Sequence, residues 1–185
     1  MTDPDTRPRV RVGIVLPQDR AADVDVTLPN FPYVVNNAPM RSVRLRVQGD
    51  GEPVTIVPQH DTLDTGVTLH AVRAGRGFHW STDIDVVLPG TIEISTKDGC
   101  LTIVNVLDVE TYLKGVITAE MSGDAPLEFL KAQCIVARSW MSAASERKHR
   151  DLNIDFCNDD CCQRYQGTGD MSRSAIDAVQ GTRGL

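Results

Sequence analysis

The sequence predicts an α+β fold: a β-rich N-terminal region, then a two-helix segment packed on a sheet, then a cysteine-containing loop. Three observations predict it. Short β-branched segments fill residues 9–106, apolar residues recur at helical spacing over residues 107–149, and three cysteines crowd together after residue 156. We expect a mobile polar leader at residues 1–8, a β-rich region at 9–80 and a second region at 81–185, with the boundary between residues 74 and 90.

Five short segments rich in β-branched residues predict strands in the first region, because Gly, Pro, Asn and Asp separate them. They cover residues 10–16, 24–28, 42–47, 54–57 and 67–72. The clearest strand pair follows, at residues 91–97 and 100–106, with Asp98 and Gly99 between them. Asp-Gly between two alternating runs predicts a β-hairpin.

The first helix is predicted from about residue 108 to residue 119, because its apolar residues recur at spacings of 3, 4, 7 and 8. These residues are Val109, Tyr112, Leu113, Val116 and Ile117. Glu120 is the next position on the same stripe. Partial burial would disfavour its charged form, which suits a general acid at neutral pH. The alternative is that the helix ends there and Glu120 points to water.

Two other features of these helices predict close packing or a site. Gly115 lies inside the first helix at a cost of about 1 kcal/mol relative to Ala, so we expect a close approach there. Pro126 predicts the start of the second helix, with an apolar stripe over residues 127–144. Lys131 and Arg138 lie on one flank of that stripe. They either snorkel at the edge of the core or point to the same pocket as Glu120, whereas Gln133 lies on a different side.

The cysteines fall into two groups. Cys100 and Cys134 are isolated in apolar segments and are expected to be buried small side chains. Three others form Cys157-Asn-Asp-Asp-Cys161-Cys162, and this Cys-x₃-Cys spacing falls within the range of zinc sites. His149 is a candidate fourth ligand of a structural zinc. A disulfide from Cys157 to Cys161 or Cys162, and free thiols, are the alternatives. A nucleophilic cysteine is disfavoured, because no Cys-His-acid arrangement accompanies it.

Composition argues against several classes of partner. The chain has 185 residues, 41% of them hydrophobic, a net charge of −6 and no cluster of Lys and Arg, which disfavours nucleic acid and anionic membranes. No apolar run is long enough to form a transmembrane segment, and we expect no signal peptide at the N-terminus.

The scattered His60, His70 and His79 are expected at the surface or in turns. A last short helix is predicted at residues 172–180, and residues 181–185 look like the start of another strand.

Three ordered motifs carry a resemblance to a known family. They are residues 107–121, ending in Ala-Glu-Met, residues 130–140, Leu-Lys-Ala-Gln-Cys-Ile-Val-Ala-Arg-Ser-Trp, and the cysteine segment at residues 155–167. The chain resembles the stage II sporulation protein D family, which includes the amidase enhancers, from about residue 91 to residue 185. The resemblance implies an extracytoplasmic lytic transglycosylase. Such an enzyme cleaves peptidoglycan glycan strands between N-acetylmuramic acid and N-acetylglucosamine and leaves 1,6-anhydro ends.

The same resemblance implies residue roles. Glu120 occupies the position of the catalytic glutamate, and Lys131 and Arg138 fall on positions of the active-site cleft, where they are expected to bind substrate. Gln133 is a further candidate for substrate binding. At the position of Cys161 the family often has histidine, and some members bind zinc there. Family members continue past the Thr-x-Gly found here at residues 182–184, so region 81–185 is expected to be a catalytic region that is incomplete at its C-terminus.

A lone carboxyl agrees with this chemistry. Ordinary glycoside hydrolysis uses two carboxylates, but in a lytic transglycosylase the C6 hydroxyl of the sugar attacks, so one residue suffices as acid and base and no cofactor is required. A steady ion pair with Arg138 would spoil the acid role of Glu120, so Arg138 is expected to contact substrate or to touch Glu120 only part of the time. The alternatives are a non-catalytic peptidoglycan-binding module that stimulates a cell-wall amidase, and a structural scaffold.

Overall fold

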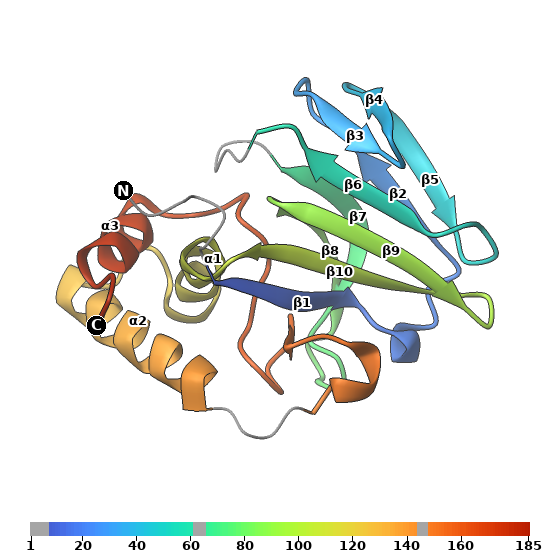
Figure 1. The fold of residues 1–185 in the computed structure, drawn as a ribbon. Helices are drawn as coiled ribbons and strands as arrows, with labels where there is room; N and C mark the ends of the chain where they lie inside the picture. The colour runs from blue at the N-terminus through green and yellow to red at the C-terminus, as the bar shows by residue number, and fades with distance from the viewer. Residues whose placement is uncertain (1–7, 61–65, 144–147) are drawn as a thin grey trace.

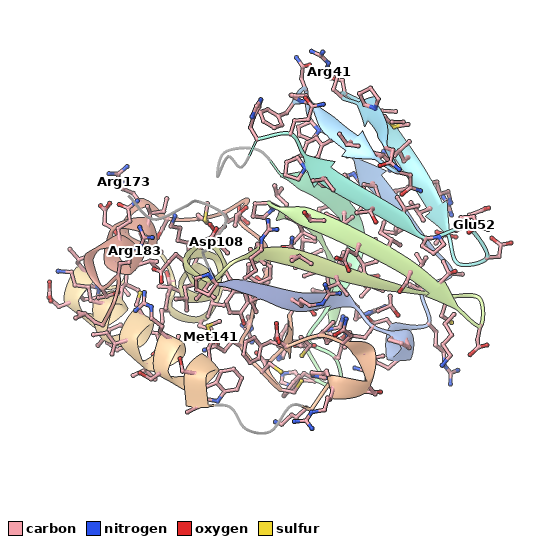
Figure 2. All side chains as sticks on the ribbon, viewed as in Figure 1. Arg41, Glu52, Asp108, Met141, Arg173 and Arg183 are labelled. Carbon is pink, nitrogen blue, oxygen red and sulfur yellow. The ribbon has the colours of Figure 1, made fainter. Side chains whose placement is uncertain are left out.

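The computed structural model describes residues 8–60, 66–143 and 148–185 and confirms the mixed α+β class. Two β-sheets lie beside a group of three helices (Figure 1). The polar leader predicted at residues 1–8 lies outside the described residues, except for its last residue, Pro8. Charged side chains such as Arg41, Glu52 and Arg173 project outward from the sheets and helices (Figure 2).

Within the described residues, one sheet has seven strands in the order β11-β1-β10-β9-β6-β3-β4, and the other has four in the order β5-β2-β7-β8. The strand bounds are β1 Arg9–Val15, β2 Asp23–Thr27, β3 Tyr33–Val35, β4 Ala38–Met40, β5 Arg44–Gln48, β6 Val54–Pro58, β7 Val67–Ala74, β8 Thr82–Leu88, β9 Thr91–Lys97, β10 Cys100–Asp108 and β11 Phe156–Cys157. The helices are α1 Val109–Met121, α2 Leu127–Ala143 and α3 Arg173–Gly181, with short 3-10 turns at Pro17–Asp19 and Arg150–Leu152.

The predicted hairpin is the part of the sheet that leads into α1. Lys97 of β9 pairs with Cys100 of β10, and the two turn residues Asp98 and Gly99 have φ values of 53° and 75°. Two positive φ values are what a type I′ hairpin turn requires. On its other side β10 pairs antiparallel with β1. Because α1 follows β10 directly, the position of α1 is fixed by the interior of the seven-stranded sheet.

Gly115 makes the close approach that its place inside α1 predicts. A Cβ atom at this position would lie 2.5 Å from Cε2 of Tyr165 and 2.6 Å from the carbonyl oxygen of Gly167. Tyr165 is buried, and its hydroxyl donates to Oδ1 of Asn105 at 3.1 Å. Gly115 therefore lets the segment after the cysteines pack directly on α1.

We expect the Gly115→Ala variant to lose about 1–3 kcal/mol of unfolding free energy, because the added methyl group overpacks a buried contact. Helix propensity acts in the opposite direction by about 1 kcal/mol. Urea unfolding measures the difference, and Ser139→Ala at an exposed position of α2 is the control. A Gly115→Ala variant as stable as the native chain would show that Tyr165 and Gly167 do not press on α1.

Three features of the fold depart from the sequence predictions. Strand β8 was not predicted, because Asp83 and Asp85 are residues that strands disfavour. In the structure they pair with Arg73 and His70 of the neighbouring strand β7. The β3–β4 hairpin was also missed. The expected strand start at residues 181–185 is wrong, because Gly181 is the last residue of α3 and residues 182–184 form turns, with the Leu185 amide donating to the Thr182 carbonyl at 3.2 Å.

Candidate functional site

Glu120 lies in the last turn of α1 and is half-buried. Its Oε2 accepts a hydrogen bond from Nε2 of Gln133 on α2 at 3.1 Å, and its Oε1 accepts one from the backbone N–H of Arg164 at 3.2 Å. Both donors are uncharged. Asp108 caps the start of α1 by accepting from the Thr111 amide, which fixes where the helix begins and hence where Glu120 lies.

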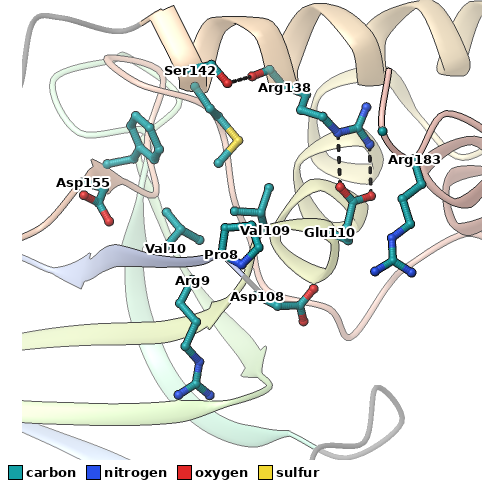
Figure 3. A pocket seen from close by; sticks show the side chains of 13 residues that line it. Pro8, Arg9, Val10, Asp108, Val109, Glu110, Arg138, Ser142, Asp155 and Arg183 are labelled. Carbon is teal, nitrogen blue, oxygen red and sulfur yellow. Dashed lines mark hydrogen bonds and ion pairs between the residues drawn. The ribbon is translucent and has the colours of Figure 1, made fainter. Parts of the chain in front are cut away.

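Of the residues predicted to accompany Glu120, only Gln133 contacts it. Arg138 instead forms a two-pronged ion pair with Glu110, through Nε at 3.2 Å and Nη2 at 3.0 Å (Figure 3). Its Nη1 also donates to the carbonyl oxygen of Thr182 at 3.1 Å. Lys131 pairs with Glu128 at 2.7 Å. Among the described residues, neither cation makes a hydrogen bond or ion pair with Glu120.

The reason for this separation is the length of α1. Glu110 and Glu120 are ten residues apart, which is about 15 Å along a helix axis. Arg138 therefore lies near the first turn of α1, where it joins α2 to α1 and to the end of α3. The guanidinium neutralises Glu110 in a place where both side chains are largely buried, with 14% and 26% of their surfaces exposed.

A pocket of about 590 Å³ lies at this same end of α1. Figure 3 shows Asp108, Glu110, Arg138 and Arg183 among the side chains that line it. Glu120 is not among its lining residues. The pocket is therefore separate from the surroundings of Glu120, and the cleft expected around the glutamate is not this one.

His149 and the three clustered cysteines come together at one point. One imidazole nitrogen of His149 and the Sγ atoms of Cys157, Cys161 and Cys162 all lie within 4.8 Å of one another. The Cys157 and Cys161 sulfurs are 3.0 Å apart, and the Cys161 sulfur is 3.7 Å from Nε2 of His149. All five cysteines are free thiols, with Cys134 buried and Cys100 partly exposed.

The pKa values of these thiols and of the imidazole are shifted in different directions, so the four groups are not all charged. A hydrogen bond with Cys162, together with burial, raises the pKa of Cys157 far above that of an ordinary thiol. Burial raises the pKa of Cys161 to about 11, whereas the hydrogen bond with Cys157 lowers the pKa of Cys162. Burial lowers the pKa of His149, which keeps its imidazole neutral as a metal ligand requires.

The cysteine loop is attached to both sheets. Cys157 in β11 pairs with Gly13 of β1 in parallel, and further on the Thr168 amide donates to the carbonyl oxygen of Val87 in β8 at 2.8 Å. Between these anchors, Gln163 accepts from the Tyr112 hydroxyl of α1 and donates to the Ala137 carbonyl of α2. The loop thus presents the Arg164 amide to Glu120, two residues after Cys162.

Arg76, from the connection between β7 and β8, holds the base of this loop. Its guanidinium binds Asp19 through Nε at 2.5 Å and Nη2 at 2.7 Å, and Nη1 donates to Oδ1 of Asn158 at 2.6 Å. Its backbone amide donates to Asp159 at 2.6 Å. The side chains of Arg76, Asp19 and Asp159 are at most 10% exposed. Sequence reasoning missed this cluster, because its members are far apart in the chain.

Comparison with known proteins identifies a family to which residues 97–185 are similar. Residues 97–185 match the family model described as Stage II sporulation protein. The chain carries a stage II sporulation protein domain. An uncharacterized protein of Brachyspira hyodysenteriae is 35% identical over 94 residues, which cover 51% of this chain and 26% of that protein. The chain thus spans about a quarter of that relative's length. No solved structure matches the chain.

The sporulation protein domain includes both parts of the candidate site, Glu120 with Gln133 and the Cys157 loop with its cysteines. The match of residues 97–185 to this family model points to a cell-wall-related, extracytoplasmic role. No helix in the described part of the chain is long and apolar enough to cross a membrane. Arg76 and the rest of the β7–β8 connection lie before residue 97, so the loop of the domain is held by residues outside the matched range.

Proposed function

We propose that this domain is a peptidoglycan lytic transglycosylase that cleaves strands between N-acetylmuramic acid and N-acetylglucosamine, with Glu120 as both acid and base. The observation that carries the proposal is the half-buried Glu120 carboxyl, hydrogen-bonded by two uncharged N–H donors. The charge of Arg138 would keep a neighbouring carboxyl ionised, but Arg138 forms its ion pair with Glu110 and not with Glu120.

In the proposed reaction, protonated Glu120 gives its proton to the glycosidic oxygen as the bond from that oxygen to C1 of the muramic acid breaks. The C6 hydroxyl oxygen of the same sugar attacks C1, which forms the 1,6-anhydro bond. The hydroxyl proton passes to the Glu120 carboxylate and restores the acid. The amide groups of Gln133 and Arg164 stabilise the carboxylate between the two transfers, so no second carboxyl and no water are needed.

Mass spectrometry of peptide-free glycan strands after incubation with the chain tests this proposal. Anhydromuramic ends, lighter by one water than hydrolysed ends, are the expected products. Reducing ends would indicate a hydrolase and contradict the proposed mechanism. Uncleaved strands that still co-sediment with the chain would favour the alternative, a non-catalytic glycan-binding module that assists a cell-wall amidase.

We also infer that Cys157, Cys161, Cys162 and His149 hold one structural zinc ion beside Glu120. Tetrahedral zinc with sulfur and nitrogen ligands places the ligand atoms about 3.5–3.8 Å apart. The four atoms here all lie within 4.8 Å of one another, so small side-chain adjustments suffice. Four protein ligands close the coordination sphere, which is typical of structural rather than catalytic zinc. The ion would fix the loop that presents the Arg164 amide to Glu120.

Metal analysis of protein purified without chelator and under reducing conditions is expected to find about one zinc per chain. The Cys157→Ser variant is expected to lose most of this zinc, because a hydroxyl is a much weaker zinc ligand than a thiolate. Cys100→Ser, at a cysteine far from the cluster in sequence, is the control and keeps the metal. Less than about 0.2 equivalents in the native chain would refute the zinc site.

A further inference from the structure

An aromatic pair on the connection between β7 and β8 lies beside the loop that contacts Glu120. The rings of Phe78 and Trp80 are stacked, with centroids 5.7 Å apart and an interplanar angle of 20°. Phe78 leaves 46% of its surface exposed. In Figure 1 this green connection lies next to the orange segment that follows α2.

Arg164 joins this aromatic pair to Glu120. Its guanidinium carbon lies 4.6 Å from the centre of the Trp80 ring, and its backbone N–H binds the Glu120 carboxylate at 3.2 Å. An arginine side chain extends about 7 Å from its backbone, so a path of at most about 15 Å connects Glu120 to Trp80. A short oligosaccharide spans this distance.

The aromatic pair is held in place by the turn that begins at Gly75. Gly75 has a φ of 71°, and a Cβ atom at this position would lie 2.4 Å from the Trp80 ring, so the ring rests directly on the glycine backbone. The next residue, Arg76, anchors the connection to Asp19 and Asp159. The amide of Phe78 donates to the carbonyl of Gly75 and closes the turn. The exposed ring of Phe78 is therefore presented on a fixed base.

We propose that Phe78 and Trp80, with Arg164 and Asp160 at their rim, form a subsite that binds one sugar ring of the glycan strand. This inference rests on the proposed function, because it assigns a further part of the same substrate. The apolar face of a pyranose ring fits an exposed aromatic ring, and its hydroxyls fit planar charged groups. Arg164 and Asp160 form such a rim through two hydrogen bonds of 3.0 Å. A flat protein partner would not need the short path to Glu120.

Tryptophan fluorescence tests the subsite without catalysis. The chain has two tryptophans, so the Trp140→Phe variant leaves Trp80 as the only reporter, and adding Glu120→Gln prevents turnover. Titration of this double variant with a peptide-free tetrasaccharide of alternating N-acetylglucosamine and N-acetylmuramic acid is expected to change the Trp80 emission saturably. Adding Phe78→Ala should weaken binding about tenfold, because one aromatic contact surface is lost.

Two further variants serve as controls for the effect of Phe78→Ala. Phe78→Tyr keeps the ring and is expected to bind the tetrasaccharide as tightly as the double variant does. Phe129→Ala removes a phenylalanine of α2 that is 53% exposed and is expected to leave the affinity unchanged.

Calorimetry provides the affinities independently of fluorescence. Unchanged affinity after Phe78→Ala, or binding without any change in Trp80 emission, would overturn the subsite and leave the proposed function standing. Absence of tetrasaccharide binding in every variant would overturn both. Loss of stimulation of an amidase with intact glycan binding would assign the aromatic pair to a protein partner instead.

Discussion

We expect the Glu120→Gln variant to cleave peptide-free glycan strands about 10²–10⁴-fold more slowly than the native chain, the usual contribution of a general acid and base. Glutamine has nearly the shape of glutamate and still accepts the hydrogen bonds of Gln133 or Arg164 through its one carbonyl oxygen. It carries no proton that it can give to the glycosidic oxygen. The rate is measured from the appearance of anhydromuramic ends with time.

The matched control for this variant is Glu128→Gln, which removes a carboxylate from the first turn of α2. Glu128 is 82% exposed and pairs only with Lys131 in the described structure, so the cleavage rate should stay within about twofold of native. Unfolding curves for both variants confirm that the fold is intact. Equal rates for native chain and Glu120→Gln would remove Glu120 from the reaction, whatever the product.

We expect the Arg76→Met variant to lose about 3–5 kcal/mol of unfolding free energy, because removing one partner leaves buried opposite charges without compensation. Asp19 and Asp159 would remain, each 7% exposed, and Asn158 and the Ile14 carbonyl would lose a donor. Such a loss is a large share of the 5–15 kcal/mol that stabilises a typical domain. Urea unfolding followed by circular dichroism measures it.

The control is Arg44→Met, which breaks an ion pair with Asp25 on the surface of the smaller sheet. Arg44 is 63% exposed, so the expected loss is at most about 1 kcal/mol. The two variants also differ in a second measurement, because only Arg76 anchors the cysteine loop. Zinc should therefore dissociate more readily from Arg76→Met than from Arg44→Met at a temperature where both are folded. Similar stability losses in both variants would show that the buried cluster around Arg76 does not hold the loop.

The elements that the sequence predicts correctly are those defined by local patterns. The apolar spacing along α1 and α2 and the Asp98-Gly99 turn each depend on neighbours within a few residues, so α1, the start of α2 and the β9–β10 hairpin were predicted within one or two residues of their observed bounds. Ser172 similarly caps α3, where its hydroxyl accepts from the Ala175 amide. Gly115 was recognised because a glycine in a helix requires a local reason.

The parts of the site that the sequence does not reveal depend on contacts between distant residues. Arg138 and Glu110 are 28 residues apart, and Arg76 lies 57 residues from Asp19 and 83 from Asp159. Apolar spacing does not indicate which charged residues form ion pairs, so Arg138 was placed in the cleft with Glu120 from its position on α2 and from the family resemblance, and its partner Glu110 was not predicted. The contact between Gln133 and Glu120 was hidden for the same reason, because it depends on how α2 crosses the end of α1.

We propose that Glu120 alone transfers the proton and that the attacking oxygen belongs to the sugar. Cleavage of peptide-free strands in water enriched in heavy oxygen tests it most directly, with the native chain and Glu120→Gln compared by mass spectrometry. The native chain should release anhydromuramic ends that contain no heavy oxygen, and Glu120→Gln should release almost none. Heavy oxygen in the new ends, or equal products from both proteins, would contradict the claim.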